Sequence, residues 1–284
     1  MVTMQDLATK HNPNWCPGCG DHAILAALKG AIVDVGVEPH KIAAVSGIGC
    51  GSNLPGWLNT YGFMSLHGRS LPVATGIKLA NKDLTVIAVG GDGDGFGIGL
   101  GHFIHTVRRN IDMTYITQDN QVYGLTTGQT SPTSAKGMKT KSTPMGVLEE
   151  PINPLELAIV SGATYVARAF AGDVVHMRKL IADGIRHKGF ALVDVFQPCV
   201  SFNKINTYDF FKQNVYKLED VGHDPADREA AMRKAFQKDK LPIGLFYKTT
   251  AQTYEDGLPQ MAQLPLVKHD IRNVDISVAL KEFM

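Results

Sequence analysis

The sequence predicts an α/β protein built on a parallel sheet with helices on both faces. Short apolar runs alternate with stretches of helical periodicity through residues 22–196, which is the pattern of repeated βαβ units. Glycine-rich or polar segments follow several of these runs, at the strand ends where open α/β sheets bind ligands. After residue 203 the pattern becomes polar and aromatic, and we expect an irregular C-terminal extension there.

Each expected strand is an apolar run between turn-forming residues. The clearest one, from Thr85 to Val89, leads into a glycine-rich loop, a helical stretch and a second run from Met113 to Thr117. Together they form one βαβ unit with loops at the carboxyl ends of its strands. The expected strands are 42–45, 85–89, 113–117, 165–169, 190–196 and 243–247.

Expected helices begin at capping side chains. Asp21, Ser70 and Asp173 are placed to act as N-caps, and Pro154 suits the first turn of a helix. Gly36 suits a helix end because glycine adopts left-handed backbone angles easily. The expected helices are 22–35, 70–79, 98–109, 154–162, 174–188 and 225–237.

We expect two parts in the chain. Residues 1–202 are predicted to form the ligand-binding domain, and residues 203–284 an extension packed on that domain or on a partner subunit. The irregular end is typical of an arm on a partner chain or of a loose tail. Residues 126–146 are polar and hold several lysines, which indicates a long surface loop, either a lid or docking segment or a mobile loop without function.

Composition narrows the function classes. A net charge of +1 gives no reason to expect nucleic acid or an anionic membrane as partner. No apolar run approaches the ~20 residues that span a bilayer, and the N-terminal residues lack the apolar core of a signal peptide. We therefore expect a cytoplasmic protein, in which the 4 cysteines more naturally bind metal or do chemistry than form disulfides.

The glycine-rich loop contains a candidate metal motif. It fits neither G-x-G-x-x-G nor the P-loop pattern. Instead Gly91-Asp92-Gly93 is followed, after 26 residues, by Asn120. A carboxylate and an amide oxygen at neighbouring strand ends suit a hard divalent cation that also binds a diphosphate. The alternative is a structural turn in which Asp92 caps the helix.

The cysteines form a second candidate site. Cys16 and Cys19 make a C-x-x-C pair, whereas Cys50 and Cys199 are isolated in the sequence. Four thiolates suit a zinc ion or an iron–sulfur cluster, and this dispersed spacing favours a cluster built into a domain. The alternative is that Cys50 and Cys199 are ordinary core cysteines.

Longer strings in the same region point to a family. The spacing from Gly91-Asp92-Gly93 to Asn120 resembles the diphosphate-binding motif of thiamine diphosphate enzymes. GDGDGFGIGLGHFIHTVRRN at 91–110 and DNQVYGLTTGQTSPT at 119–133 resemble the β subunits of 2-oxoacid:ferredoxin oxidoreductases. This resemblance runs from Trp15 to Cys199 and continues more weakly beyond.

The resemblance implies the diphosphate-type thiamine diphosphate-binding fold, with cofactors bound by residues 1–202. It implies that Mg²⁺ is held by Asp92, Asn120 and the carbonyl of Val122. The contexts WCPGCG, GIGC and QPC imply a 4Fe-4S cluster on Cys16, Cys19, Cys50 and Cys199. The other implied cofactor contacts are Gly91, Gly93, Asp94, Gly124, Leu125 and Thr126 along the diphosphate, and Ile48, Gly49 and Cys50 near the thiazolium.

Four further side chains have open roles. The resemblance places His67 near substrate or an intermediate, and the alternative is a structural histidine bonding a loop carbonyl. Arg69 suits a substrate carboxylate or a surface or intersubunit salt bridge. His102 and His105 lie three apart on a helix, which suits a metal but is more typical of packing or interface residues.

The implied activity is oxidative decarboxylation of a 2-oxoacid with coenzyme A and ferredoxin, or the reverse reductive carboxylation. The strings GIGCGSN and NTYGF…LHGR resemble the 2-oxoglutarate branch more than the pyruvate branch. In the family, an α subunit supplies the pyrimidine-binding half of the site and its glutamate, so we expect an αβ unit or an (αβ)2 assembly. The alternatives are a pyruvate or broad-specificity 2-oxoacid enzyme, a non-redox thiamine diphosphate decarboxylase, and a non-catalytic zinc-stabilised module.

Overall fold

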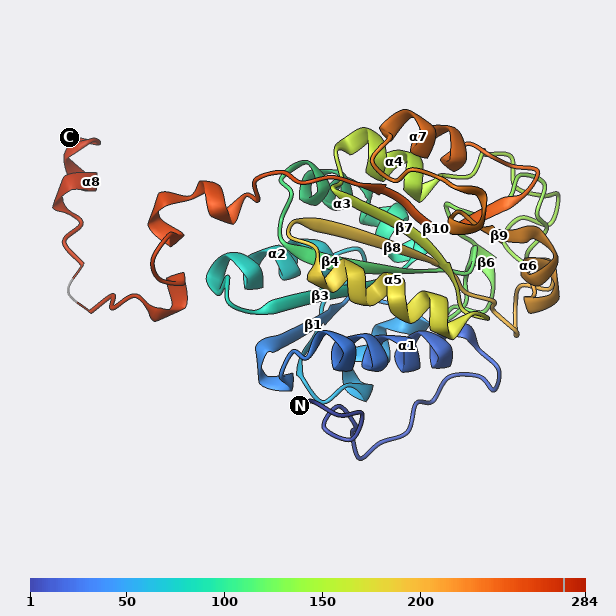
Figure 1. Cartoon of the computed structure of the whole chain (residues 1–284), viewed down its shortest axis with the longest axis horizontal. Helices are drawn as coiled ribbons and strands as arrows, with labels where there is room; N and C mark the ends of the chain where they lie inside the picture. Colours follow the sequence, from blue (N-terminus) through green and yellow to red (C-terminus); the bar gives the residue numbers. More distant parts are fainter. Residues whose placement is uncertain (273) are drawn as a thin grey trace.

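The computed structural model describes residues 1–272 and 274–284. Its main sheet has the order β2-β1-β3-β4-β8-β7-β10-β9 (Figure 1). All neighbours pair in parallel except β10, which runs antiparallel to β7. These strands are β1 (Ile42–Ser46), β2 (Tyr61–Met64), β3 (Thr85–Gly91), β4 (Met113–Asp119), β7 (Tyr165–Phe170), β8 (Phe190–Phe196), β9 (Val215–Lys217) and β10 (Leu241–Lys248); β5 (Val122–Tyr123) and β6 (Gln129–Thr130) form a separate pair.

Helices cover both faces of this sheet. The core on one face packs the strands against α1 and α5, and the core on the other packs them against α2, α3, α4 and α7 (Figure 1). Both cores consist of fully buried aliphatic and aromatic side chains, whose burial is the main stabilising contribution. The helices are α1 (Gly20–Val35), α2 (Ser70–Ala80), α3 (Leu100–Arg108), α4 (Pro154–Ser161), α5 (Val174–Arg186), α6 (Tyr208–Asn214), α7 (Arg228–Ala235) and α8 (Ser277–Lys281).

The predicted fold class is confirmed, with corrections at the sheet edges. The expected strands are all present, but β2 and β9 were not predicted, because all four residues of β2 are exposed and β9 has only three residues. The antiparallel direction of β10 was also missed, since an apolar pattern contains no information on strand direction. The helix expected at 98–109 begins at Leu100, and a π-helical turn (Asp94–Ile98) precedes it.

Helix caps were predicted with mixed success. Asp173 caps α5 by accepting from the backbone N–H of His176, and Gly36 ends α1 with a φ of 79°. Asp21 is not a cap: the turn of Cys16 to Cys19 starts α1 earlier, so Asp21 lies buried in its first turn. Ser70 is likewise the first residue of α2 rather than its N-cap.

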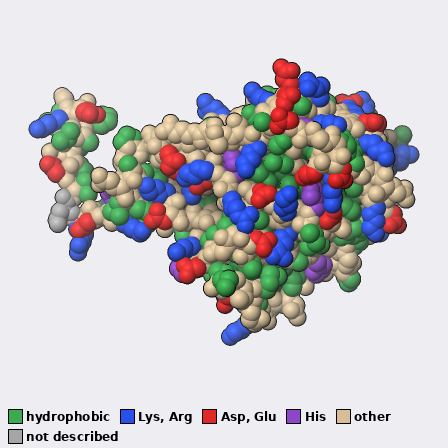
Figure 2. Space-filling model, viewed as in Figure 1, with side chains coloured by type: hydrophobic (Ala, Val, Ile, Leu, Met, Phe, Trp, Pro, Cys, Tyr) green, Lys and Arg blue, Asp and Glu red, His purple; other side chains and the backbone are tan. Residues whose placement is uncertain are grey.

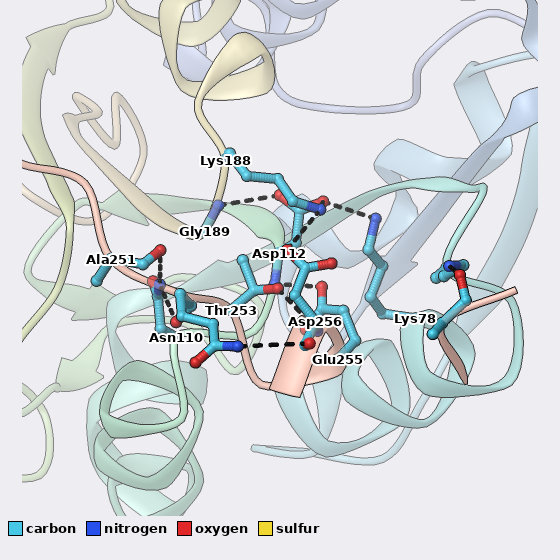
Figure 3. A network of polar contacts seen from close by, with 12 residues as sticks. Lys78, Asn110, Asp112, Lys188, Gly189, Ala251, Thr253, Glu255 and Asp256 are labelled. Carbon is cyan, nitrogen blue, oxygen red and sulfur yellow. Dashed lines mark hydrogen bonds and ion pairs between the residues drawn. The ribbon is translucent and has the colours of Figure 1, made fainter. Parts of the chain in front are cut away.

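The segment after β10 is fastened to the main sheet by polar contacts (Figure 3). The Asn110 amide donates to the carbonyls of Ala251 and Gln252, and the Asp112 backbone N–H donates to Glu255 Oε1 at 3.0 Å. The Asp112 carboxylate also pairs with Lys78 at 2.9 Å. This part of the extension therefore packs on the same domain. It lies at the amino-terminal ends of the central strands, whereas Cys199 follows the carboxyl end of β8.

The final segment leaves the body of the molecule and ends in α8 (Figure 1). Its apolar side chains are exposed, among them Leu266, Val267, Ile271, Val274, Ile276, Val278, Leu280 and Phe283. Elsewhere on the face seen in Figure 2, charges of both signs are interspersed. Among the helices described, none is both long and apolar enough to cross a membrane.

Candidate functional site

A cavity of about 330 Å³ lies at the carboxyl ends of the central strands. Every residue predicted to contact the thiazolium, the diphosphate or Mg²⁺ lines it. These residues are Ile48, Gly49, Cys50, His67, Gly91, Asp92, Gly93, Asp94, Asn120, Val122, Gly124, Leu125 and Thr126. Gly51, Gln118 and Tyr123 also line it and were missed. Gln118 Nε2 is buried without a hydrogen-bond partner, so it presents a free donor at the wall of this cavity.

Asp92 is buried at the base of the cavity. Its Oδ2 accepts hydrogen bonds from Thr133 Oγ1 at 2.6 Å and from the Ser131 hydroxyl. Burial raises the pKa of Asp92 to about 6, and the two hydroxyls oppose that rise. The helix-cap alternative is wrong, because the following helical turn has Gly93 at its N-cap and no side-chain cap. Asp92 is instead a buried carboxylate held by two side chains of a distant loop.

Thr133 lies between two acidic side chains. Its Oγ1 is 2.6 Å from Asp92 Oδ2 and 2.8 Å from Asp119 Oδ1. The Thr133 hydroxyl thus connects the carboxyl group that lines the cavity to a second buried carboxyl group. Burial raises the pKa of Asp119 well above its usual value, and the nearby charges of Asp194 and Asp92 add to the rise.

These contacts correct the interpretation of residues 126–146 as a surface loop. Ser131, Thr133, Ser134 and Met138 are buried, while Lys136 is exposed. The loop folds inward because its hydroxyl groups find partners beside Asp92 and at the carbonyl of Gln121. Its polar composition reflects a buried hydrogen-bond network and not only exposure to water.

Asn120 lies opposite Asp92 at the end of β4. Its Oδ1 accepts from the Val122 N–H at 3.1 Å, and its Nδ2 donates to Gln197 Oε1 at 2.7 Å. The next residue, Gln121, has a φ of 60°, which turns the chain so that Val122 reaches the cavity. Gly93 is required here, since a Cβ at this position would lie 2.1 Å from the Tyr123 ring.

Asp94 organises the opposite wall. Its Oδ1 accepts from the backbone N–H groups of Ile48 at 2.8 Å and Gly68 at 2.7 Å, and lies 3.2 Å from His67 Nδ1. It thereby joins the loop after β1 to the turn before α2. A Cβ at Gly47 would collide with the Asp94 carboxylate. The carboxylate of Asp94 thus lies beside His67, whose ring lines the cavity and whose Nδ1 forms no hydrogen bond with a described residue.

The remaining predicted side chains lie apart. Arg69 is outside the lining of this cavity, donates to the Gly68 carbonyl at 3.3 Å and forms no ion pair with a described residue. His102 and His105 are on α3, and burial lowers the pKa of His102. No group of three or more histidine, cysteine, aspartate or glutamate side chains in the described chain is placed to hold a single metal ion. The two histidines are thus helix residues without further ligands.

A second cavity of about 260 Å³ adjoins the first, and all four cysteines line it. The two cavities share Cys50, Asn120, Gly124 and Leu125. Gly124 forms part of the wall between them, because a Cβ there would lie 3.6 Å from both Cys50 Sγ and Cys199 Sγ. Residues remote in the sequence therefore surround one space beside the Asp92 cavity.

The chemistry of this second cavity suits a group larger than one ion. A zinc ion needs its thiolates to converge on one point at ~2.3 Å, and no such cluster is present among the described residues. Burial raises the pKa of Cys50 to about 11 and that of Cys19 further, so thiolates need a cationic partner here. Gln197 Nε2 donates to Cys19 Sγ at 3.1 Å and Ser201 Oγ to Cys16 Sγ at 3.2 Å. Such donors stabilise iron-bound sulfur.

Comparisons with protein families agree with this geometry. The family described as thiamine pyrophosphate enzyme, C-terminal TPP binding domain, matches residues 43–195. The family that describes the C-terminal part of the pyruvate ferredoxin oxidoreductase beta subunit matches residues 199–263. The first match contains Asp92 and Asn120, and the second begins at Cys199.

Similar proteins have been named in several organisms. The subunit beta of 2-oxoacid:ferredoxin oxidoreductase 1 from Aeropyrum pernix is 46% identical over 87% of this chain and 81% of its own length. The 2-oxoglutarate synthase subunit KorB of Archaeoglobus fulgidus is 41% identical over 74% of this chain and 79% of its own. A solved structure, the 2-oxoglutarate:ferredoxin oxidoreductase from Magnetococcus marinus with 2-oxoglutarate, coenzyme A and succinyl-CoA bound, superposes with a TM-score of 0.92 at 42% identity, covering 100% of this chain and 96% of that one.

Proposed function

This chain belongs to the β subunits of the 2-oxoacid:ferredoxin oxidoreductases, and from that premise we propose that it carries both the thiamine diphosphate and a 4Fe-4S cluster of a 2-oxoglutarate-specific enzyme. The observation that carries the proposal is the common wall of the two cavities, formed by Cys50, Asn120, Gly124 and Leu125. Cofactors held in these adjoining cavities would lie close enough for electron transfer between them. The family assignment is incompatible with a non-catalytic zinc-stabilised module.

The first cavity suits the diphosphate and its cation. Asp92, Asn120 and the Val122 carbonyl supply oxygen ligands for Mg²⁺, and Gln118 Nε2 and the glycine backbone offer donors to the anion. Bound there, thiamine diphosphate would supply a nucleophilic carbanion at C2 for a 2-oxoacid substrate. His67, which lines this cavity beside Asp94, would be placed to contact the substrate.

Substrate choice rests on the relatives. The Archaeoglobus fulgidus relative named for 2-oxoglutarate is 41% identical over 74% of this chain, and the 2-oxoglutarate oxidoreductase subunit KorB of Mycobacterium tuberculosis is 46% identical over 70% of this chain and 53% of its own length. These relatives support 2-oxoglutarate as substrate, with coenzyme A and a ferredoxin acceptor. The second candidate is a broader 2-oxoacid or pyruvate enzyme, because the Aeropyrum pernix relative is named for 2-oxoacids in general. Assaying the purified αβ complex with 2-oxoglutarate, pyruvate and 2-oxobutyrate decides between them: a kcat/KM at least tenfold higher for 2-oxoglutarate supports the proposal, and comparable values refute it.

We expect Thr133→Val to weaken Mg²⁺-dependent cofactor binding by about tenfold. This is the smaller of the losses in metal affinity that follow when a residue hydrogen-bonded to a metal ligand is replaced. The valine keeps the shape of threonine but removes the hydroxyl that bonds Asp92 at 2.6 Å. Titration of the apo complex with Mg²⁺ at saturating thiamine diphosphate measures the effect. Thr133→Ser, which keeps the hydroxyl, is the matched control, and equal affinities in both variants would disprove the role of this bond.

Serine replacements test the cluster. Cys16→Ser, Cys19→Ser, Cys50→Ser and Cys199→Ser should each lower the iron content and abolish electron transfer to ferredoxin, because each removes one thiolate from the second cavity. Thiamine diphosphate binding should survive in Cys16→Ser, since Cys16 does not line the first cavity. Iron analysis and visible absorbance give the readout. A variant with wild-type iron content and ferredoxin reduction would show that its cysteine is not a ligand.

A further inference from the structure

The side chain of Gln197 lies between the two cavities. It follows β8, its backbone N–H donates to the Asp119 carbonyl at 3.0 Å, and it is 1% exposed. Its Cγ passes over Gly20, where a Cβ would lie only 2.7 Å away. Glycine at the start of α1 therefore makes room for this glutamine.

Both ends of the Gln197 amide have partners. Oε1 accepts from Asn120 Nδ2 at 2.7 Å, while Nε2 donates to Cys19 Sγ at 3.1 Å and to the Pro198 carbonyl at 3.2 Å. A proline carbonyl can only accept, so it fixes which end of the glutamine amide is the NH2 group. Oε1 must then face Asn120, and Asn120 must present its own NH2 group to it.

This chain of constraints fixes the orientation of Asn120. With Nδ2 directed at Gln197, Oδ1 is directed to the side on which the Val122 N–H lies, at 3.1 Å. A carbonyl oxygen has two lone pairs, so one remains for a cation. A reversed amide would instead direct an NH2 group toward the cation.

We propose that Gln197 is a positioning residue for both cofactors: it orients the Asn120 amide oxygen toward Mg²⁺ and donates a hydrogen bond to the Cys19 sulfur. This inference rests on the proposed function. An N–H donor stabilises negative charge on a cluster sulfur, and the reduced cluster carries more of that charge. Gln197 therefore raises the reduction potential of the cluster that receives electrons from the adjacent cavity.

Two substitutions separate the roles. Gln197→Leu removes the partner of Asn120 and the donor to Cys19, whereas Gln197→Glu keeps an oxygen to accept from Asn120 Nδ2 and replaces the donor to Cys19 with a carboxyl oxygen. In the αβ complex, we expect both variants to shift the reduction potential to more negative values in an EPR-monitored redox titration. Only Gln197→Leu should weaken Mg²⁺ binding in the presence of thiamine diphosphate, by about tenfold.

Ser201→Ala is the matched control. Its hydroxyl donates to Cys16 Sγ at 3.2 Å and forms no described hydrogen bond to Asn120. This variant should lower the potential and leave Mg²⁺ affinity unchanged. Iron content equal to wild type in all variants shows that each complex has assembled, and the isosteric Gln197→Glu variant provides the potential measurement even where Gln197→Leu does not fold.

The wild-type complex distinguishes this inference from the proposed function. Absence of iron or of a Mg²⁺ response in wild type would refute the proposed function, and the inference with it. A wild type with both cofactors, together with a Gln197→Leu variant of unchanged potential and unchanged Mg²⁺ affinity, would overturn the inference alone. A lowered potential with unchanged Mg²⁺ affinity in Gln197→Leu would also overturn it, because the coupling to Asn120 would then be absent.

Discussion

Asp92→Ala should reduce Mg²⁺-dependent thiamine diphosphate affinity by more than about 100-fold. Loss of a residue that only supports a metal ligand lowers metal affinity by about 10- to 100-fold, and loss of a ligand itself should lower it more. The substitution removes the one carboxylate among the three proposed metal ligands, and the diphosphate then has no cation between it and the protein. The remaining ligands, Asn120 and the Val122 carbonyl, are neutral. A carboxylate attracts Mg²⁺ by its full negative charge, so its loss should lower affinity for the cation more than loss of a neutral oxygen ligand would.

The fold should survive this substitution. Asp92 is buried, and its charge is disfavoured there, as its raised pKa of about 6 shows. Its removal leaves the apolar cores on either face of the sheet intact but deprives the buried Ser131 and Thr133 hydroxyls of their acceptor. The apo variant should therefore still fold, with an unfolding temperature moderately below that of apo wild type. Isothermal titration of the αβ complex and thermal unfolding of the same samples measure both quantities. Asp209→Ala, at an exposed aspartate on α6, is the control, and an Asp92→Ala variant with wild-type affinity would refute the metal assignment.

The same carboxylate predicts a pH dependence. Protons and Mg²⁺ compete for Asp92, whose pKa is about 6 before the metal binds. Mg²⁺-dependent affinity should therefore be nearly constant above pH 7 and fall as the pH drops through 6, with a limiting slope of tenfold per pH unit. The slope should disappear in Asp92→Asn, which has no proton to lose in this range.

Many of the residues that line the two cavities could be singled out from the sequence because their signals are local. Gly91-Asp92-Gly93 and Asn120 follow apolar runs that pair as neighbours, and the carboxyl ends of neighbouring parallel strands necessarily meet. Cys16 and Cys19 were recognised by their C-x-x-C spacing, and Cys50 and Cys199 by residue type and by their positions after predicted strands. In each case one short segment contained both the element and its functional side chain.

The supporting groups could not be predicted in this way. Thr133 and Ser131 lie in a segment whose polar composition is also that of an exposed loop, and only the folded chain shows that Asp92 is their partner. Gln197 has no local signal either, since its partners are 77 and 178 residues away in the sequence. Asp21 was misplaced for a related reason, because the Cys16–Cys19 turn determines where α1 begins.

The isolated chain should not oxidise 2-oxoacids at a measurable rate, and activity should appear only when the α subunit is added. No glutamate is among the described residues that line the first cavity, in keeping with the expectation from the family that the α subunit supplies the group that acts on the pyrimidine end of the cofactor. Apolar side chains next to this cavity are also exposed, including Leu125 at 55%, Leu66 at 76% and Ile98 at 57%. Exposed apolar surface beside a half-open site marks an interface.

The exposed surface makes this prediction testable by association as well as by activity. The isolated chain should bind thiamine diphosphate weakly and self-associate in size-exclusion chromatography, because Leu66 and Leu125 have no partner to cover them. Leu66→Glu should weaken association with the α subunit, whereas Val175→Glu, at an 81% exposed residue on α5, should leave it unchanged. Robust oxidation of 2-oxoglutarate by the purified single chain would refute the two-subunit site, since the chain would then have to supply the missing glutamate itself.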